Sequence, residues 1–276
     1  MKWSQAKTIL IVFFILVDLF LLFYLASDQR SSRQAFDKVT QNTVEVLKNN
    51  GISVKKELIL KEGKADSMKT AYVENIIKDY RDFAKLILGE DTQKKSDTHF
   101  VSENGEIKFS GDSFEVKAIK GELTLTKGIT DSSDAQKTAK ELAELMGIDL
   151  KKASVSAKEE NGKYIVKISQ KINKCEIFGA GVELEFSKSG IKSIKGCWYN
   201  NGEGNNTAVK LKALAGALIE YMNSIKAVGK NLEITDISLG YKAGEGMTHH
   251  ESLVLTPVWR ITDNTGKSVY IDAREN

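Results

Sequence analysis

The chain has 276 residues, of which 41% are hydrophobic and 28% are charged. This composition is typical of a globular protein and excludes a largely disordered one. A formal net charge of +3 is too small to indicate nucleic-acid binding, so no nucleic-acid partner is expected.

Residues 8–26 form an apolar stretch that is long enough to cross a membrane. As a helix with about 1.5 Å of rise per residue, this stretch would extend roughly 28 Å, close to the thickness of the hydrocarbon layer. Lys2 and Lys7 precede it, and basic residues favour the cytoplasmic side. The pattern predicts a cytoplasmic tail at residues 1–7, a single transmembrane anchor at residues 8–26 and an extracytoplasmic remainder. The chain is therefore expected in the cell membrane.

A cleaved signal peptide is the alternative interpretation of this apolar stretch. Its apolar region usually has about 7–15 residues and ends at a cleavage site flanked by small residues. Tyr24 stands where cleavage after Ala26 would need a small residue, and Leu25 stands there for cleavage after Ser27. These residues favour an uncleaved anchor.

Asp18 lies almost at the midpoint of the predicted anchor. A carboxyl group at the bilayer centre opposes insertion by roughly 2.5–3.5 kcal/mol, so it is usually kept for a function. We expect Asp18 to form a hydrogen bond with a polar group on a partner helix. The alternative is that the carboxyl group has no partner and is tolerated because it draws in water. The residues that share its helix face by i±3, i±4 and i±7 spacing are Ile11, Phe14, Ile15, Leu21, Leu22 and Leu25.

The first half of the outer region contains helical patterns and short strand patterns. Apolar residues at helical spacing predict helices at residues 30–50 and 67–88, each followed by a glycine. Residues 52–60 between them have the pattern of a strand. Short alternating runs separated by turn dipeptides predict antiparallel strands at residues 99–101, 106–110, 113–119 and 122–126.

The second half repeats this alternation. Asp131 and the serines after it can cap a helix, and they predict a helix at residues 131–147. A further helix is expected at residues 207–225. The tetrapeptide Asp263–Gly266 indicates a hairpin turn between the last two strands. Strands are predicted at residues 154–159, 163–172, 182–186, 191–199, 233–241, 253–262 and 268–273.

Helices and runs of strands thus alternate in blocks, which predicts an α+β fold with helices packed on one side of antiparallel sheets. A boundary near residues 126–131 would divide the outer region into two packed modules, at residues 30–128 and 129–276. With the N-terminal transmembrane helix, the chain is expected to contain an anchor and two extracytoplasmic α+β modules.

Cys175 and Cys197 are the two cysteines of the chain. Both fall outside the predicted membrane segment, in a compartment where a disulfide can persist. Their spacing encloses a hairpin, so a bond between neighbouring strands is feasible, but the sequence does not set the required separation. A disulfide and two free thiols both remain open.

No residue pattern supports catalysis, a metal site or a cofactor. Ser-x-x-Lys occurs at Ser4, Ser53 and Ser189, but none of these serines opens a helix as the catalytic motif requires. His249 and His250 are adjacent, and neighbouring positions in a strand point to opposite faces. Tetrahedral zinc needs three or four converging ligands, so exposed loop histidines are the favoured interpretation. The chain is not expected to be an enzyme.

Three aromatic residues in the second half, Trp198, Trp259 and Tyr270, could line a ligand groove. Aromatic residues at alternating strand positions are more often part of the core, because each buries a large apolar area. A core role is therefore favoured for them.

Several short motifs resemble those of the YycI proteins of low-GC Gram-positive bacteria. At the N-terminus the resemblance rests on Trp3-Ser4-x-x-Lys7-Thr8-Ile9 and on residues 16–22. Further along it rests on Ile177-Phe178-Gly179-Ala180, on Gly196-x-Trp198 and on residues 255–261. The resemblance covers most of the chain, although residues 89–130 contain no recognisable motif of the family.

The resemblance implies a non-enzymatic, single-pass membrane protein that acts with a YycH-like partner on the sensor histidine kinase of the essential cell-wall two-component system. The short cytoplasmic tail is consistent with this role, because an inward signal would have to pass through helix contacts in the membrane. The alternative function is an extracytoplasmic module that binds a peptide or a cell-wall fragment and is retained by the anchor.

Overall fold

The computed structural model describes residues 14–15, 17–20, 34–63, 65–119, 123, 129–202, 207–225, 231–243 and 253–275. The chain forms two compact units, each built from separate stretches of sequence. Unit 1 comprises Met1–Lys64, Ala213–Ile237 and Ile261–Val269, and unit 2 comprises Ala65–Lys212, Ser238–Arg260 and Tyr270–Asn276. The strands β14 (Leu232–Ala243) and β15 (Leu253–Asp263) each contribute residues to both units.

Unit 1 is built mainly from helices. The helix at residues 34–49 leads into strand β1, which pairs in parallel with the beginning of β14, with Ile52 opposite Leu232. Helices α2 and α5 contact each other. Apolar side chains from these elements are buried, among them Leu47, Ile59 and Leu218. The elements of unit 1 not yet given bounds are β1 (Ile52–Val54), α2 (Lys56–Glu62) and α5 (Leu214–Ile225).

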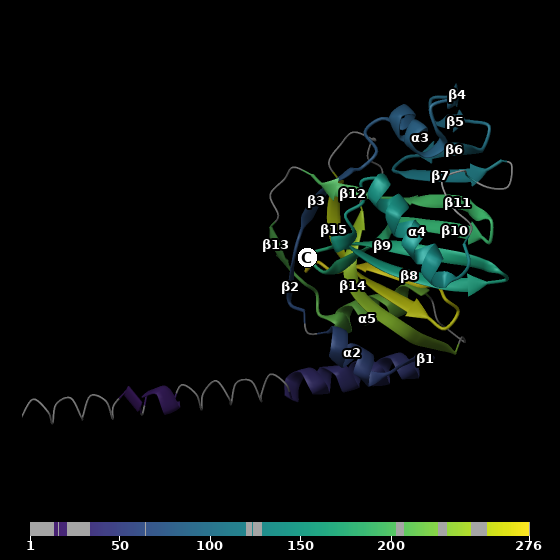
Figure 1. The fold of residues 1–276 in the computed structure, drawn as a ribbon. Coiled ribbons are helices and arrows are strands. Elements are labelled where there is room, and N and C mark those ends of the chain that lie inside the picture. The colour runs from purple at the N-terminus through teal and green to yellow at the C-terminus, as the bar shows by residue number, and fades with distance from the viewer. Residues whose placement is uncertain are drawn as a thin grey trace, which may run out of the picture. The chain divides into compact units, whose positions relative to one another are not determined.

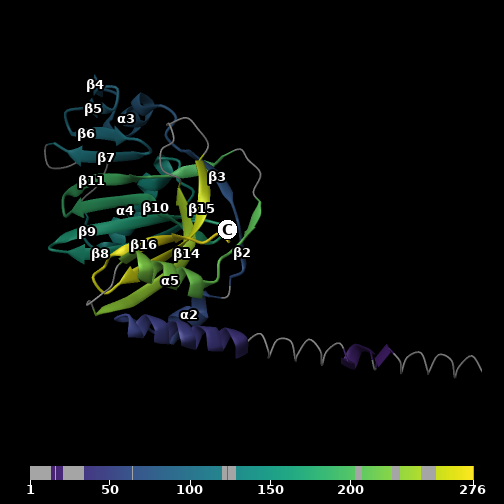
Figure 2. The same ribbon diagram turned by 180° about the vertical axis from the view of Figure 1, so that it is seen from behind.

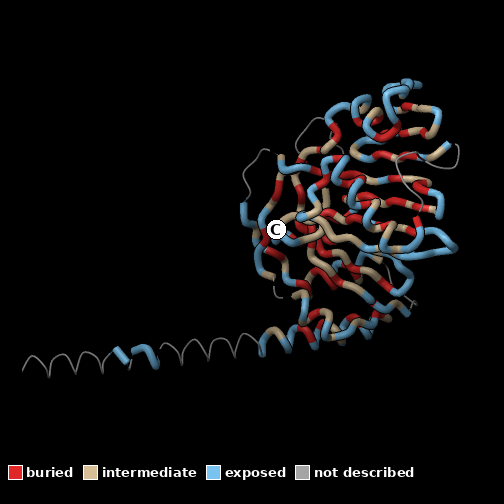
Figure 3. The backbone as a smooth tube through the Cα atoms, in the orientation of Figure 1, coloured by how far each residue is buried: buried red, intermediate tan, exposed pale blue. Residues whose placement is uncertain are grey.

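The main part of unit 2 is an antiparallel sheet in the order β8-β9-β10-β11-β7-β6-β5-β4 (Figure 1). Glycines with positive φ form the tight turns between neighbouring strands, including Gly111 and Gly162. Buried and exposed residues alternate along the strands (Figure 3). The strands are β4 (Gln93–Ser96), β5 (His99–Val101), β6 (Gly105–Ser110), β7 (Ser113–Ala118), β8 (Ala153–Glu160), β9 (Lys163–Ile172), β10 (Cys175–Ser187) and β11 (Gly190–Cys197).

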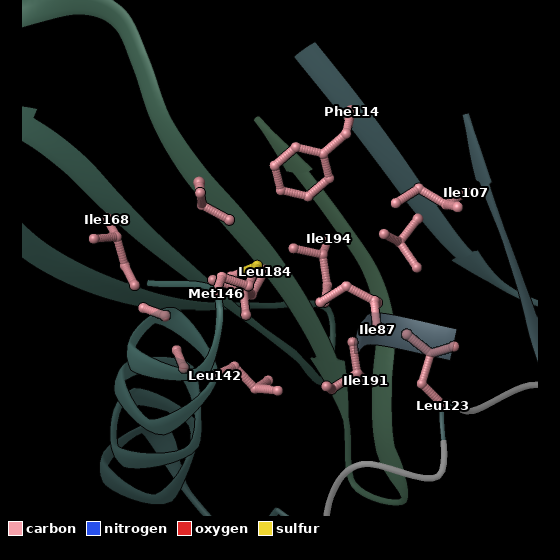
Figure 4. Packing of buried hydrophobic residues seen from close by; sticks show 14 of the residues in the cluster. Ile87, Ile107, Phe114, Leu123, Leu142, Met146, Ile168, Leu184, Ile191 and Ile194 are labelled. Carbon is pink, nitrogen blue, oxygen red and sulfur yellow. The ribbon is translucent and has the colours of Figure 1, made fainter. Parts of the chain in front are cut away.

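Helices α3 (Tyr80–Leu88) and α4 (Ser132–Leu145) lie on one face of this sheet, where α3 contacts β5 and β6 and α4 contacts β8 and β9. A short 3₁₀ helix, η1 (Leu150–Lys152), follows α4. Figure 4 shows Leu142 and Met146 on the same side of the sheet as Ile168, Leu184 and Ile194. The core therefore lies between the helices and this face, and the opposite face, turned toward the viewer in Figure 2, carries no helix of unit 2 among the described residues.

Beyond β10 the sheet continues through β14 and β15. Ile177 and Phe178 of β10 pair in parallel with Tyr241 and Lys242 of β14. The beginning of β15 and strand β12 flank β3 in antiparallel pairing, and β16 pairs with β15. Strands β13 and β2 form a separate two-stranded sheet. These strands are β2 (Ser67–Lys69), β3 (Ala71–Asn75), β12 (Tyr199–Asn201), β13 (Ala208–Lys210) and β16 (Ser268–Asp272).

The α+β fold predicted from the sequence is confirmed, and most predicted strands are present with boundaries close to the expected ones. The helix expected at residues 131–147 is α4, which begins after Asp131. The Asp131 carboxylate accepts hydrogen bonds from the backbone N–H groups of Ser133 (2.7 Å) and Asp134 (2.9 Å). The sheets are mixed and not purely antiparallel, because β14 pairs in parallel with both β1 and β10. Most of residues 122–126 lie outside the described residues.

Two predictions in the first half are wrong. Residues 67–88 do not form one helix, since β2 and β3 precede α3. Along β3, Ala71, Val73 and Asn75 are buried in strict alternation, and pairing with β15 stabilises the strand despite the helical spacing of the neighbouring apolar residues. Residues 52–60 do not form one strand, since α2 begins at Lys56. Glu57 in its first turn and Lys61 in its last turn match the helix dipole.

Three further differences concern secondary-structure elements. Residues 207–225 contain β13 before helix α5, which starts only at Leu214. Strand β10 begins at Cys175, well before the predicted residue 182, and β4 was not predicted because all its residues are exposed and polar. The expected boundary between residues 128 and 129 lies inside unit 2, where β7 pairs with β11.

Candidate functional site

A groove of about 740 Å³ lies in unit 2 where strand β10 bends. Residues of β5, β6, β7, β9, β10 and β11 line it, so it crosses the sheet perpendicular to the strands. We call it the β10 groove. Pockets that bind small ligands usually enclose about 300–1,000 Å³, so its size suits a ligand.

The bend in β10 creates the groove. The β9–β10 ladder shifts register between Glu176 and Gly181, and within this interval Ile177 and Phe178 of β10 pair with β14. Gly181 has a φ of 150°, and a Cβ atom there would lie 2.4 Å from the carbonyl oxygen of Ile168. A Cβ atom on Gly196 of the neighbouring strand would lie 2.0 Å from the Gly181 carbonyl oxygen. Only glycine allows the backbones to approach this closely, so the groove has a floor of small residues.

A row of charged side chains of alternating sign borders this floor. In the strand register, Lys167 lies opposite Glu183, Glu183 opposite Lys195 and Lys195 opposite Glu115. Lys108 follows opposite Glu115 on the next strand. All five side chains line the groove. Cross-strand partners of opposite charge stabilise a sheet, so the row also helps to fix the register of these strands.

Most of these charges are held in ion pairs. Lys195 Nζ lies 2.9 Å from Glu183 Oε1, and this carboxylate raises the pKa of Lys195. Glu115 pairs with Lys117 at 3.0 Å. Lys108 pairs with Glu106 at 3.2 Å. Burial opposes ionisation of Glu106, but its hydrogen bonds with Lys108 and His99 outweigh burial and lower its pKa.

An aromatic and cationic stack lies beside the groove, next to its lining residue Glu176. The Arg260 guanidinium lies 4.4 Å from the centre of the Phe178 ring, within cation–π distance, and 3.6 Å from the Glu176 carboxylate. Phe178 in turn packs on Gly240, where a Cβ atom would lie 2.5 Å from the ring. Tyr270 packs on the Phe178 ring at a centroid distance of 5.6 Å. The stack thus holds the first half of β10 in its bent path.

A buried polar network lies next to the groove. The Gln170 side-chain amide pairs with the backbone N–H and C=O of Tyr199. The Tyr199 hydroxyl donates to the Asp112 carboxylate (3.3 Å), to which the Asn75 side chain also donates (3.3 Å). Burial, with the nearby Cys197 thiol and Asp112 carboxylate, strongly raises the pKa of Tyr199. The network fixes the β6–β7 turn, whose flanking serines, Ser110 and Ser113, line the groove.

The predicted membrane-helix residues lie far from this groove in sequence and are described only in part. Phe14, Ile15 and Asp18 lie in helical segments and are exposed in the structure. Ile11, Leu21, Leu22 and Leu25 lie outside the described residues. Among the helices that the structure describes, none combines the length and the apolar character needed to cross a membrane.

Cys175 and Cys197 do not form a disulfide in the structure. Their strand partners differ, since Cys175 lies opposite Ile172 and Cys197 lies opposite Gly181 beyond the bend. The Cys197 thiol donates to the Gly179 carbonyl at 3.4 Å, and burial raises its pKa.

The aromatic residues and histidines singled out from the sequence lie in different places. Trp198 and Trp259 are buried in the core, whereas Tyr270 is exposed and belongs to the stack on Phe178. His249 and His250 lie outside the described residues. Within the described ranges, no three His, Cys, Asp or Glu side chains gather in a way that could hold a metal ion.

Sequence reasoning missed the β10 groove and its charged row. Alternation of charged and apolar residues along each strand identifies the polar face, to which Glu183 and Glu185 belong on β10. Which charges become neighbours depends on strand order and register, and these involve strands far apart in the sequence. Of the motifs on which the family resemblance rests, Gly179, Ala180 and Gly196 line this groove, and Arg260 pairs with its lining residue Glu176.

Comparison with solved structures finds distant similarities. An uncharacterized protein from Eubacterium rectale aligns with a TM-score of 0.50 and 13% identity, covering 76% of this chain and 82% of that chain. YycH from Bacillus subtilis aligns with a TM-score of 0.47 and 12% identity, covering 74% of this chain and 52% of that one. The C-terminal domain of Bacillus megaterium YpeB aligns with a TM-score of 0.33 and 9% identity, covering 71% of this chain and 91% of that chain. At such identities the first of these similarities indicates a shared fold alone.

Comparison of the sequence itself gives a clearer result. No curated protein shows a significant match. The family model described as YycI protein matches residues 30–274, which include both compact units and all lining residues of the β10 groove. Because this match covers most of the chain, the chain belongs to the YycI protein family.

Proposed function

We propose that the chain is a non-enzymatic regulator of the sensor histidine kinase of a cell-wall two-component system. The observation that carries this proposal is the family match over residues 30–274, since the YycI family is a regulatory family of such a system. In this proposal the chain acts by forming a complex with the kinase and with a YycH-like partner.

The proposed location follows from the N-terminal sequence. Residues 8–26 would cross the cell membrane once, with residues 1–7 in the cytoplasm and both compact units outside. In this proposal a signal to the kinase passes through contacts between membrane helices, with Asp18 as the polar contact.

The chemistry of the β10 groove is consistent with a non-enzymatic role. Its carboxylates Glu115, Glu176 and Glu183 are each held in an ion pair with a lysine or an arginine. These ion pairs favour binding and structural support over proton transfer, because each carboxylate already interacts with a cationic side chain.

The test is substitution of Asp18 in the full-length chain, co-expressed with the kinase and the YycH-like partner. Asp18→Leu removes the hydrogen bond and should weaken association by roughly threefold to fifteenfold, since such bonds between membrane helices contribute about 0.6–1.7 kcal/mol. Pull-down from solubilised membranes measures association, and phosphorylation of the response regulator measures kinase output.

Asp18→Asn is the matched control, because the amide keeps the shape and the capacity to form hydrogen bonds. It should retain association. If Asp18→Leu leaves both association and kinase output unchanged, Asp18 has no part in the mechanism and the outer units are the contact.

A second candidate function is capture of a peptide or a cell-wall fragment by the outer region, with the anchor serving for retention. The β10 groove is the specific observation that favours it, because its volume and its floor of small residues suit a ligand.

A further inference from the structure

The length of the β10 groove matches a short extended chain. It runs from Lys167 on β9 to Lys108 on β6, across the order β9-β10-β11-β7-β6. At about 4.8 Å between neighbouring strands, this path covers roughly 19 Å. An extended peptide rises about 3.3 Å per residue, so roughly five to six residues would span it.

The floor of the groove suits an uncharged peptide body. Gly179, Ala180 and Gly181 form it on β10, and Ser110 and Ser113 continue it on β6 and β7. A Cβ atom on Gly179 would meet no atom within 4 Å, so the backbone there is open to a ligand. Small residues let a ligand approach the sheet backbone closely.

The charges of the groove leave one cation available. Glu183, Glu176 and Glu115 already pair with Lys195, Arg260 and Lys117. Lys167 is exposed at the β9 end of the row and forms no ion pair with any residue that the structure describes. One uncommitted ammonium group at the end of an uncharged floor is complementary to a ligand with one terminal carboxylate.

We propose that the β10 groove binds an extended peptide of about five residues, whose uncharged body lies on the small-residue floor and whose free carboxylate pairs with Lys167. This inference deepens the second candidate function and does not rest on the kinase contact. Its test involves neither Asp18 nor the kinase, so either proposal can fail alone.

The test is binding of acetyl-pentaalanine to the full-length chain in detergent micelles, measured by ligand-detected NMR and by calorimetry. The peptide with a free carboxylate should bind, and its C-terminal amide should bind roughly threefold to fivefold more weakly, since an exposed ion pair contributes up to about 1 kcal/mol. Added salt should reduce this difference because it screens exposed charges.

Lys167→Gln should remove the preference for the free acid. Lys163→Gln is the matched control, since Lys163 lies on the same strand and the same face but outside the groove, where it pairs with Glu185 at 2.6 Å. Ser113→Tyr should fill the groove and abolish binding of both peptides, because the Ser113 side chain is exposed there. Ser133→Tyr, on helix α4 at the opposite face of the sheet, should leave binding unchanged.

Circular dichroism of each variant checks that it is folded. If Ser113→Tyr misfolds, the comparison of Lys167→Gln with Lys163→Gln still tests the proposal, because Lys167 is exposed. Three results would overturn the proposal: no binding of either peptide, equal affinity for acid and amide, or equal weakening by Lys163→Gln and Lys167→Gln. If neither peptide binds, the groove is instead a surface that a partner protein covers.

Discussion

Single residues at the β10 bend have roles that depend on their neighbours in space. Gly181 and Gly196 allow two backbones to approach each other, and Gly240 accommodates the Phe178 ring. A side chain at any of these positions would force the sheet to move. The two cysteines differ in the same way, since Cys197 is buried beside the Gly179 carbonyl and Cys175 is only partly buried.

We predict that the two thiols react at different rates. Burial raises the pKa of Cys197 and shields its sulfur, so little reactive thiolate is available. Cys175 should react with iodoacetamide at least about tenfold faster than Cys197 in the native chain. Peptide mass spectrometry after timed labelling measures both rates.

Labelling in denaturant is the control, and there both thiols should react alike. Equal rates in the native chain would show that Cys197 is not protected, and a peptide linked through both cysteines would show that they form a disulfide.

At the scale of elements, short local signals determine where turns and helices begin. The Asp263 carboxylate accepts hydrogen bonds from the Thr265 hydroxyl and backbone N–H (2.5 and 2.9 Å), and Gly266 with its φ of 80° completes the hairpin turn. The Thr265 hydroxyl is the main cause of the lowered pKa of Asp263, and the backbone N–H groups add to it. Asp263 also acts on helix α5, since burial and then this carboxylate raise the pKa of Tyr221 to about 12.

We predict that Asp263 makes the stability of the chain depend on acid pH. A carboxylate whose pKa is lowered on folding stabilises the native state above its unfolded value of 3.8, and this contribution is lost as pH falls through the lower folded value. Asp263→Asn should lower the urea midpoint at neutral pH and flatten its fall in acid. Urea unfolding followed by circular dichroism across the acid range measures this effect.

Glu141→Gln, at an exposed position of helix α4, serves as the control and should leave the acid dependence as it is in the wild type. If the Asp263→Asn curve runs parallel to the wild-type curve at every pH, the turn carboxylate does not contribute to the pH dependence.

At the scale of the whole molecule, the sheet of unit 2 joins distant parts of the sequence. Strand β7 pairs with β11, and Val116 lies opposite Ile194. Phe114 and Ile107 from the earlier residues share one core cluster with Leu184 and Ile194 from the later residues (Figure 4). A division of the chain at residues 128 and 129 would therefore expose both a sheet edge and half of this core.

We predict that a fragment of residues 129–276 does not fold by itself. Removal of residues 34–128 leaves the β11 edge without β7 and exposes apolar side chains that the native core buries. The fragment should lack a cooperative thermal transition and should aggregate, whereas a fragment of residues 34–275 should unfold cooperatively. Circular dichroism and light scattering measure both properties.

A monomeric 129–276 fragment with a cooperative transition would contradict this expectation. It would show that the later residues form an independent core, as the two-module interpretation of the sequence expects.

The sequence by itself determined the α+β class, most strands, helix α4 and the hairpin turns, because these depend on neighbouring residues: alternation, Asp131 as a cap and glycines in turns. Only the tertiary structure decided that residues 71–75 are a strand, because their pairing with β15 outweighs helical spacing. The β10 groove likewise required the fold, since register between strands that are distant in sequence brings Lys167, Glu183, Lys195 and Glu115 into one row. Periodicity within a segment reveals which face of a strand is buried, but partners across a sheet depend on long-range contacts that no single segment encodes.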